Sequence, residues 1–163
     1  MTMSEPSLQR RSAQPYAAIR IRVPQAQISS ACPPLIGEVF AWLAAHDLEP
    51  AGAPFFRYAR MDADGETIDV GVPLARKASV ADERVRFGTL PAGRYATLTY
   101  TGPYHGIPQA AQRLMAWGPQ QGLKWASSPE DQEMTYIEFY PTDPMREPDP
   151  QKWVTELVNL VQD

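Results

Sequence analysis

The feature that most constrains the fold is an order of predicted elements, strand–helix–strand–strand, that occurs twice along the chain. In the first half, residues 16–23 alternate in the way a half-buried strand does, and residues 35–43 have apolar side chains at helical spacing. Residues 55–61 and 68–74 are rich in aromatic and β-branched side chains and flank the turn Asp62-Ala63-Asp64-Gly65. The first half is therefore predicted to be a β-α-β-β unit that ends in a hairpin.

The second half repeats this order. Residues 85–90 and 94–101 are predicted strands, and Ile107-Pro108 begins a helix that ends before Gly122. Residues 136–140 are predicted to form the next strand. The last apolar segment, residues 153–161, fits either a strand or a short helix, and its β-branched content favours the strand.

The repeat leads to a specific fold prediction. The fold class is α+β, with duplicated β-α-β-β modules, an antiparallel sheet, two main helices and a central groove. Residues 16–83 form the first half and residues 84–163 the second. Residues 1–15 are polar and are predicted to be a disordered tail. Val70-Gly71-Val72-Pro73 and Glu138-Phe139-Tyr140-Pro141 are interpreted as equivalent positions of the two halves.

Composition excludes several classes of function. The formal net charge of −4 provides no strong attraction to nucleic acid or to an anionic membrane. No apolar run approaches the roughly 20 residues that span a bilayer, and a cytoplasmic location is expected. The single cysteine, Cys32, excludes an intrachain disulfide. His46 and His105 are isolated, and no glycine-rich phosphate loop is present, so no metal and no cofactor are expected.

The segment Tyr136-Ile137-Glu138-Phe139-Tyr140 carries the most chemical information. Side chains alternate along a strand, so Tyr136, Glu138 and Tyr140 share one face, and Ile137 and Phe139 share the other. If the second face lies on the core, a carboxylate stands between two phenol rings. A carboxylate that is buried without a cation has a raised pKa, and aromatic rings attract cations by about 0.5–2 kcal/mol each. This pattern favours a flat, apolar and possibly cationic ligand.

Five short motifs then occur in a fixed order. They are Pro54-Phe55-Phe56-Arg57-Tyr58, Asp69-Val70-Gly71-Val72-Pro73, Leu90-Pro91-Ala92-Gly93-Arg94-Tyr95-Ala96, Tyr100-Thr101-Gly102-Pro103-Tyr104 and Glu138-Phe139-Tyr140-Pro141-Thr142-Asp143-Pro144. Over roughly residues 16–162 the chain thereby resembles the GyrI-like small-molecule-binding domain, the effector-binding domain of certain AraC-type and MerR-type transcription activators. No DNA-binding domain precedes these motifs, so a stand-alone form is expected.

The resemblance implies a duplicated β-α-β-β fold with a central pocket for hydrophobic, often cationic, molecules. The family's strand glutamate lies at the pocket floor, and the matching residue here is Glu138. The candidate ligand-binding residues are Glu138, Tyr104, Tyr136, Tyr140, Phe56, Tyr58 and Trp117. Which face of the first hairpin lines the groove stays open, because Phe56 and Tyr58 lie on one face and Phe55 and Arg57 on the other. Tyr104 is as consistent with a structural role as with pocket lining, and Trp117 is typical of a core residue.

Three functions are compatible with these residues. The first is binding of a hydrophobic or cationic small molecule. The second, implied by some members of the family, is hydrolysis of cyclopropane-containing genotoxins, with Glu138 as base or nucleophile and Tyr104 or Tyr136 as proton donor. The third is a protein-interaction role, such as protection of gyrase, with a partner that the sequence does not identify. The first two use the same pocket, so the sequence does not separate them.

Overall fold

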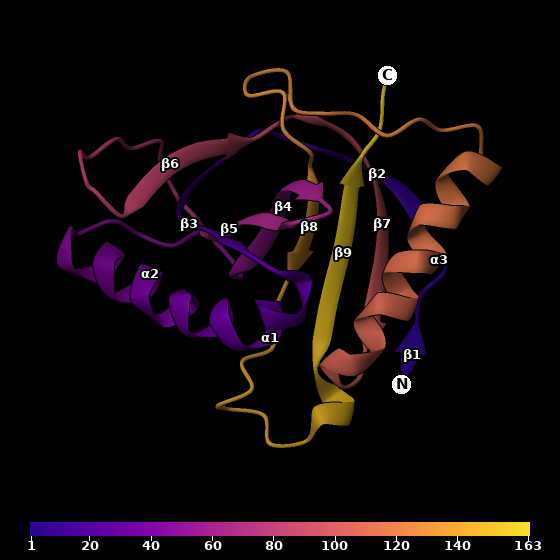
Figure 1. The fold of residues 1–163 in the computed structure, drawn as a ribbon, viewed down its shortest axis with the longest axis horizontal. Coiled ribbons are helices and arrows are strands. Elements are labelled where there is room, and N and C mark those ends of the chain that lie inside the picture. Colours follow the sequence, from indigo (N-terminus) through magenta and orange to yellow (C-terminus); the bar gives the residue numbers. More distant parts are fainter.

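The computed structural model describes residues 1–163 as one antiparallel sheet with helices against it (Figure 1). The strands are β1 (Thr2–Met3), β2 (Ser7–Arg11), β3 (Gln14–Val23), β4 (Phe55–Asp62), β5 (Gly65–Pro73), β6 (Val85–Leu90), β7 (Gly93–Thr101), β8 (Tyr136–Phe139) and β9 (Val154–Leu160). The helices are α1 (Ile28–Ala31), α2 (Pro33–Ala45) and α3 (Ile107–Gln120), with single 3-10 turns at Gln25–Gln27, Tyr104–Gly106 and Pro150–Lys152. The α+β class predicted from the sequence is confirmed, and residues 153–161 contribute the strand β9.

The sheet is symmetric about the contact between β4 and β8. Outward from this contact the order is β4-β5-β3-β6 on one side and β8-β9-β7-β2 on the other. The repeated units are therefore β3-α2-β4-β5 and β7-α3-β8-β9. Each half is also extended by a strand from the other half of the chain: the N-terminal strand β2 pairs with β7, and β6 pairs with β3. The topology makes β8 the counterpart of β4, so the predicted equivalence of residues 70–73, in β5, with residues 138–141 is wrong.

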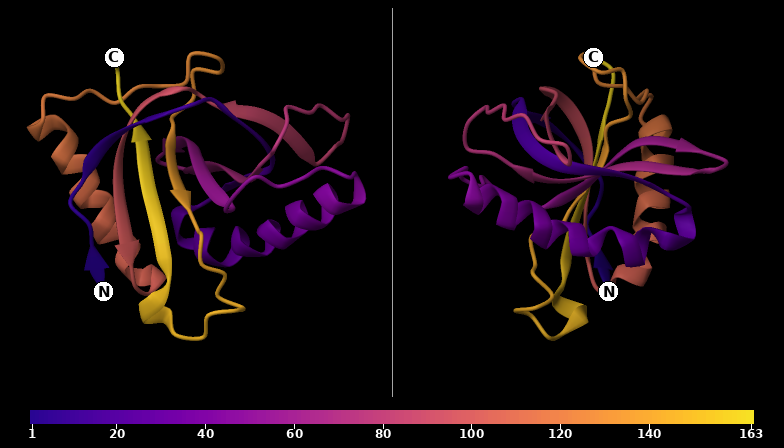
Figure 2. Two further views of the ribbon diagram at one scale, coloured as in Figure 1. Left: turned by 180° about the vertical axis from the view of Figure 1, so that it is seen from behind. Right: turned by 60° about the vertical axis from the view of Figure 1, so that its left-hand side comes forward.

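The N-terminal segment differs from its prediction as a disordered tail over residues 1–15. β1 and β2 both pair with the edge of β7, with Leu8 opposite Ala96 and Arg10 opposite Arg94. In the rear view of Figure 2 this indigo segment lies alongside β7. Side chains of an edge strand remain in water while the backbone makes its hydrogen bonds, so a polar sequence suits an edge strand as well as it suits disorder.

Two helices cover one face of the sheet. Each begins with a proline in its first turn, where a missing N–H costs nothing. α2 buries Leu35, Val39 and Leu43 and packs mainly on β5, while α3 buries Ala110 and Leu114 and packs on β7 and β9. No single helix is long and apolar enough to cross a membrane; the bent pair of residues 25–31 and 33–45 meets the criteria of length and composition only when both parts are combined.

The opposite face, which we call the rear face, has a core of its own. It is built around Tyr16, Phe55, Ile137 and Val158, all of them buried. Phe55 lies directly over Gly71 of the neighbouring strand, and a Cβ at Gly71 would lie 2.5 Å from the ring. The glycine of the Val-Gly-Val-Pro motif therefore makes room for this ring. With Phe55 and Ile137 turned to the rear, the alternate residues of β4 and β8 face the helices.

Candidate ligand-binding site

Glu138 lies on the helix face of the sheet, where the two halves meet. It is opposite Phe56 of β4 and Leu157 of β9, and Tyr136 is opposite Tyr58. Because paired residues share a face, Phe56, Tyr58, Tyr136 and Glu138 all point into the strip between α2 and α3. In Figure 1 β8 runs through this strip. The register places the Phe56/Tyr58 face of the first hairpin, and not the Phe55/Arg57 face, on the side of the sheet that carries Glu138.

Three phenol groups enclose the Glu138 carboxylate. Tyr136 donates a hydrogen bond to Oε2 at 2.7 Å, Tyr140 donates to Oε1 at 2.7 Å, and Tyr58 donates to Oε1 at 3.5 Å. Glu138 is only 6% exposed. Tyr136 is also buried, whereas Tyr58 and Tyr140 are half-buried and form the outer side. We call these four residues the phenol cluster.

No cationic side chain balances the charge in the phenol cluster. None of the ion pairs of the protein includes Glu138. Burial raises the pKa of Glu138, and the hydrogen bonds from the phenols offset only part of this rise. Burial and the nearby carboxylate also raise the pKa values of Tyr136 and Tyr140. The phenols therefore stay protonated donors, and the carboxylate is held by neutral groups alone.

Aromatic rings continue from the phenol cluster toward the surface. The ring of Phe56 lies 4.8 Å from that of Tyr140, which lies 5.9 Å from Tyr104. Tyr104 in turn packs at 4.8 Å against Trp153, just before β9. Tyr104 is 36% exposed and makes no hydrogen bond to Glu138, so it lies at the outer end of the row. Trp153 is not among the ligand-binding residues predicted from the sequence. Its only sequence signal is that it is an aromatic residue at the start of residues 153–161, which fit either a strand or a helix.

Trp117 lies apart from this row. It is half-buried on α3 and packs against the cluster that contains Leu114 and Leu157. Tyr136 belongs to the same cluster and Tyr58 packs against it, so Trp117 is linked to the strands β4 and β8 through the α3 core. It makes no ring contact with Tyr140 or Tyr104 of the kind that links the row itself. The placement matches the core-like alternative that the sequence left open.

Sequence reasoning missed a second acidic group near the phenol cluster. Glu66 begins the alternating series Glu66, Ile68, Val70 on β5, and it therefore lies on the helix face. It is 5% exposed, and its Oε2 has no hydrogen-bond partner. Cys32 is fully buried nearby; burial and the charge of Glu66 raise the pKa of its thiol to about 11. The sequence signal that could have found Glu66 is its place at the start of an alternating series whose other members are apolar.

The acidic and thiol groups do not form a metal centre. No three or more His, Cys, Asp and Glu side chains are grouped in a way that could hold a metal ion. The helix-face site therefore consists of carboxylates, phenols and aromatic rings. Such a set can recognise positive charge and flat apolar surface, and it can exchange a proton between a carboxyl and a phenol.

Comparison with known proteins defines the family. The family model of the GyrI-like small-molecule-binding domain matches residues 4–160. The chain belongs to this family. No match was found among curated protein sequences. The domain match begins before the segment that the sequence motifs identified, which agrees with the ordered β2 strand of this GyrI-like domain.

Several solved structures share the fold of this GyrI-like domain. The C-terminal domain of EcmrR superposes with a TM-score of 0.79 at 19% identity, covering 98% of both chains. A chain in the structure of an EcmrR–DNA complex gives a TM-score of 0.80 at 19% identity. The match covers 98% of the present chain but only 57% of that chain. The structure of SAV2435 bound to tetraphenylphosphonium gives a TM-score of 0.64 at 14% identity, and the match covers 98% of the present chain and 94% of SAV2435. A hydrolase from Listeria innocua gives a TM-score of 0.65 at 10% identity, and the match covers 97% of the present chain and 92% of the hydrolase chain.

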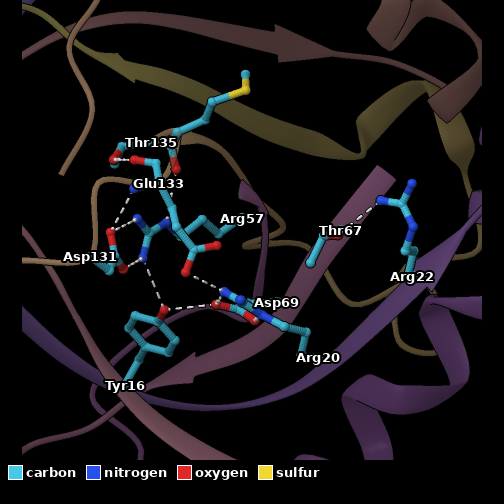
Figure 3. Close-up of polar contacts among 10 residues, drawn as sticks. Tyr16, Arg20, Arg22, Arg57, Thr67, Asp69, Asp131, Glu133 and Thr135 are labelled. Atoms are coloured by element: carbon cyan, nitrogen blue, oxygen red, sulfur yellow. Dashed lines mark hydrogen bonds and ion pairs between the residues drawn. The ribbon is translucent and has the colours of Figure 1, made fainter. Parts of the chain in front are cut away.

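The rear face of the GyrI-like domain carries a contrasting polar network (Figure 3). Arg57, fully buried, donates two hydrogen bonds to Asp131 at 3.0 and 3.1 Å, one to Tyr16 and one to the carbonyl of Met134. Tyr16 donates to Asp69 at 2.9 Å. The polar groups of Arg57, Tyr16, Asp69 and Asp131 are thus all hydrogen-bonded, whereas in Glu133, also drawn in Figure 3, the buried Oε2 has no hydrogen-bond partner.

Arginines neutralise the carboxylates of this rear network. Arg20 contacts Asp69 at 2.8 Å and Glu133 at 3.0 Å. Partial burial would raise the pKa of Asp131, but the hydrogen bond and charge of Arg57 hold it below its usual value. The network ties the segment before β8 to β3, β4 and β5. It thereby fixes the strand that presents Glu138 on the other face.

The rear face also contains a cavity of about 410 Å³. Its walls include Tyr95, Ile137 and Phe139, with Arg11 at the rim. Glu138 and its phenols are not among the residues that line it. The carboxylate thus faces away from this cavity, toward the strip between the helices.

Proposed function

We propose that the domain binds a lipophilic cation at the phenol cluster, with Glu138 as its counter-charge. The observation that carries this proposal is a carboxylate, only 6% exposed, that is hydrogen-bonded by phenols alone. A buried charge without a partner is costly, and a bound cation relieves that cost. A structural carboxylate would instead be paired with arginine, as those on the rear face are.

The surrounding rings suit the apolar part of such a ligand. Phe56, Tyr140, Tyr104 and Trp153 form a continuous row from the cluster to the surface. Each ring contributes about 0.5–2 kcal/mol to a cation placed over its face. Tyr58 and Tyr140 are half-buried over the carboxylate, so the ligand enters by turning these two side chains outward. A fold relative, SAV2435, was solved with tetraphenylphosphonium, a ligand of this class.

The test is a titration with tetraphenylphosphonium followed by intrinsic fluorescence or calorimetry. Glu138→Gln removes the charge with little change in volume, and we expect affinity to fall at least about tenfold, which is about 1.4 kcal/mol. Glu156→Gln is the matched control, because Glu156 lies on the adjacent strand and faces the rear, where it pairs with Arg11. Its affinity should equal that of the unaltered protein. Equal affinity in Glu138→Gln would remove the proposed role of this carboxylate.

A second function, hydrolysis of a strained electrophile, is favoured by one observation. The same carboxyl has a raised pKa and accepts a 2.7 Å hydrogen bond from Tyr136. A raised pKa suits a general base near neutral pH. Tyr136, not the distant Tyr104, is then the nearer proton donor for a leaving oxygen. One fold relative is named as a hydrolase.

The two functions separate by product analysis. The protein would be incubated with a cyclopropane-bearing alkylator, and the ring-opened product quantified against buffer. Catalysis predicts turnover that is lost in Glu138→Gln and reduced in Tyr136→Phe. No turnover above buffer, together with binding of tetraphenylphosphonium, would leave the binding function alone.

A further inference from the structure

The observation that the proposed function does not use is the second buried carboxylate, Glu66. Its side chain is 5% exposed and its Oε2 is buried without any hydrogen-bond partner. No ion pair of the protein includes it. A buried carboxylate oxygen without a hydrogen-bond partner destabilises the folded protein, so it calls for an explanation that packing does not provide.

Glu66 lies on the same face of the sheet as the phenol cluster. It shares the helix face of β5 with Ile68 and Val70, whose core cluster is bordered by Tyr58 and Tyr140. Tyr58 lies between the two acids in the sheet, because it is opposite Tyr136, two residues from Glu138, and opposite Ile68, two residues from Glu66. The charges of both acids also raise its pKa. The charge of Glu66 also adds to the raised pKa of Glu138. The two carboxylates therefore interact electrostatically, with the Tyr58 ring between them.

The spacing of the two acids follows from the strand register. Glu138 is opposite Phe56, and Phe56 is opposite Val70, so the acids lie two strands apart, with Glu66 four residues before Val70. At about 4.8 Å between strands and about 3.3 Å per residue, their Cα atoms are on the order of 16 Å apart. The side chains shorten the distance between charges. One compact cation cannot contact both, but an elongated ligand can.

We propose that Glu66 is a second anionic subsite, and that the preferred ligand is an elongated lipophilic dication with one cationic end at Glu138 and the other at Glu66. This inference rests on the proposed function, because it assumes that a cation binds at Glu138. Tyr58 covers the path between the subsites, and its 3.5 Å contact is the longest hydrogen bond in the phenol cluster. Rotation of this one ring joins the two subsites along an apolar wall of β5.

Two probes of one alkyl length test the inference. Decamethonium carries a quaternary ammonium group at each end, and decyltrimethylammonium carries one only. Affinities of both would be measured by calorimetry for the unaltered protein and for Glu66→Gln. We expect Glu66→Gln to weaken decamethonium at least about fivefold while decyltrimethylammonium changes less than about twofold. Glu138→Gln should weaken both probes, and Glu156→Gln should weaken neither.

The outcomes distinguish this inference from the function on which it rests. If decyltrimethylammonium and tetraphenylphosphonium bind in a Glu138-dependent way but Glu66→Gln leaves the ratio of the two probe affinities unchanged, the second subsite is wrong and the proposed function stands. If no cation binds the unaltered protein, both are wrong. Glu66→Met serves as a second variant. Circular dichroism and thermal melting of each variant show whether it is folded, so that a change in the ratio of the two probe affinities is not caused by unfolding.

Discussion

The acidic side chains on the two faces of the sheet have different kinds of partner: arginines on the rear face and phenols on the helix face. On the rear face, Arg57 pairs with Asp131 and Arg20 pairs with Asp69, so each acid has a cation within 3.1 Å. On the helix face, Glu138 has phenol partners only. The pKa of Asp131 is lowered and that of Glu138 is raised, although they lie only seven residues apart in the sequence.

This difference separates a structural role from the binding role that we propose for Glu138. A paired carboxylate contributes to stability near neutral pH because its charge is compensated in the folded state. A carboxylate held by neutral donors costs stability when it ionises, and a ligand cation can recover that cost. The rear network also orders residues 131–135, which lead into β8. The rear face therefore holds β8 in place, and the helix face carries the proposed binding site.

The largest effect should come from the rear network. Arg57→Met removes four hydrogen bonds, leaving Asp131 without its cation and the Tyr16 hydroxyl without its donor. Arg57 is fully buried whereas the Asp131 side chain is 34% exposed, so the cost comes mainly from the hydrogen bonds that Arg57 makes. At about 1 kcal/mol or less for each bond, the four together contribute about 3 kcal/mol to the free energy of unfolding. Urea denaturation monitored by tryptophan fluorescence gives this value. A loss below about 1 kcal/mol would show that the rear face does not carry the stability assigned to it.

The phenol cluster predicts a graded effect. Tyr140→Phe removes a 2.7 Å bond to the carboxylate, and Tyr58→Phe removes one of 3.5 Å. At pH 8 we expect Tyr140→Phe to cost about 1.5 kcal/mol, as for a hydrogen bond to a charged group, and Tyr58→Phe to cost clearly less. Equal losses for the two variants would contradict the order of bond lengths. The same urea titrations measure both.

Glu138→Gln should stabilise the folded protein at pH 8. The pKa of Glu138 is raised by folding, so its contribution to stability is fully present below the unfolded value, near 4.5, and is lost as pH rises through the folded value. Gln stays neutral at every pH. We therefore expect Glu138→Gln to be more stable than the unaltered protein at pH 8, and this gain to shrink as the pH approaches 4.5, because burial penalises only the ionised carboxylate.

The pH series also tests the contrast between the faces. Asp131→Asn should destabilise the protein at pH 8, because the pKa of Asp131 is lowered by folding and its contribution is lost only as pH falls through that low value. A change of the same sign for Glu138→Gln and Asp131→Asn would contradict the assigned difference. Thermal melts from pH 4 to pH 8 compare the two variants directly.

The smallest effect is expected at an exposed ion pair. Arg22 binds Asp62 at 2.7 Å, and both side chains are about half exposed. Water and salt screen such a pair, so Arg22→Met should leave the urea midpoint almost unchanged. This variant is the control for Arg57→Met, because it is the same substitution outside the buried network. If Arg22→Met lowered the stability as much as Arg57→Met, the loss would come from replacing any arginine with methionine and not from breaking the rear network.

Much of the fold followed from local pattern. Alternation placed Tyr136, Glu138 and Tyr140 on one face, and helical spacing gave α2 and α3, because side-chain periodicity depends on the backbone alone. The hairpin at residues 62–65 followed from its turn residues. The disorder predicted for residues 1–15 differs from the structure because an edge strand gains its hydrogen bonds from a partner more than 80 residues away.

The sequence by itself determined the elements of this protein, their duplicated order and the side of β8 on which the acid stands, because these depend on neighbours a few residues apart. Only the tertiary structure decided which hairpin face meets Glu138, which acids are neutralised and that Glu66 lies beside the phenol cluster. Those outcomes depend on strand register between distant segments, and a shift of one residue would turn each of these side chains to the other face. The charge of a buried acid is therefore a property of the packed sheet.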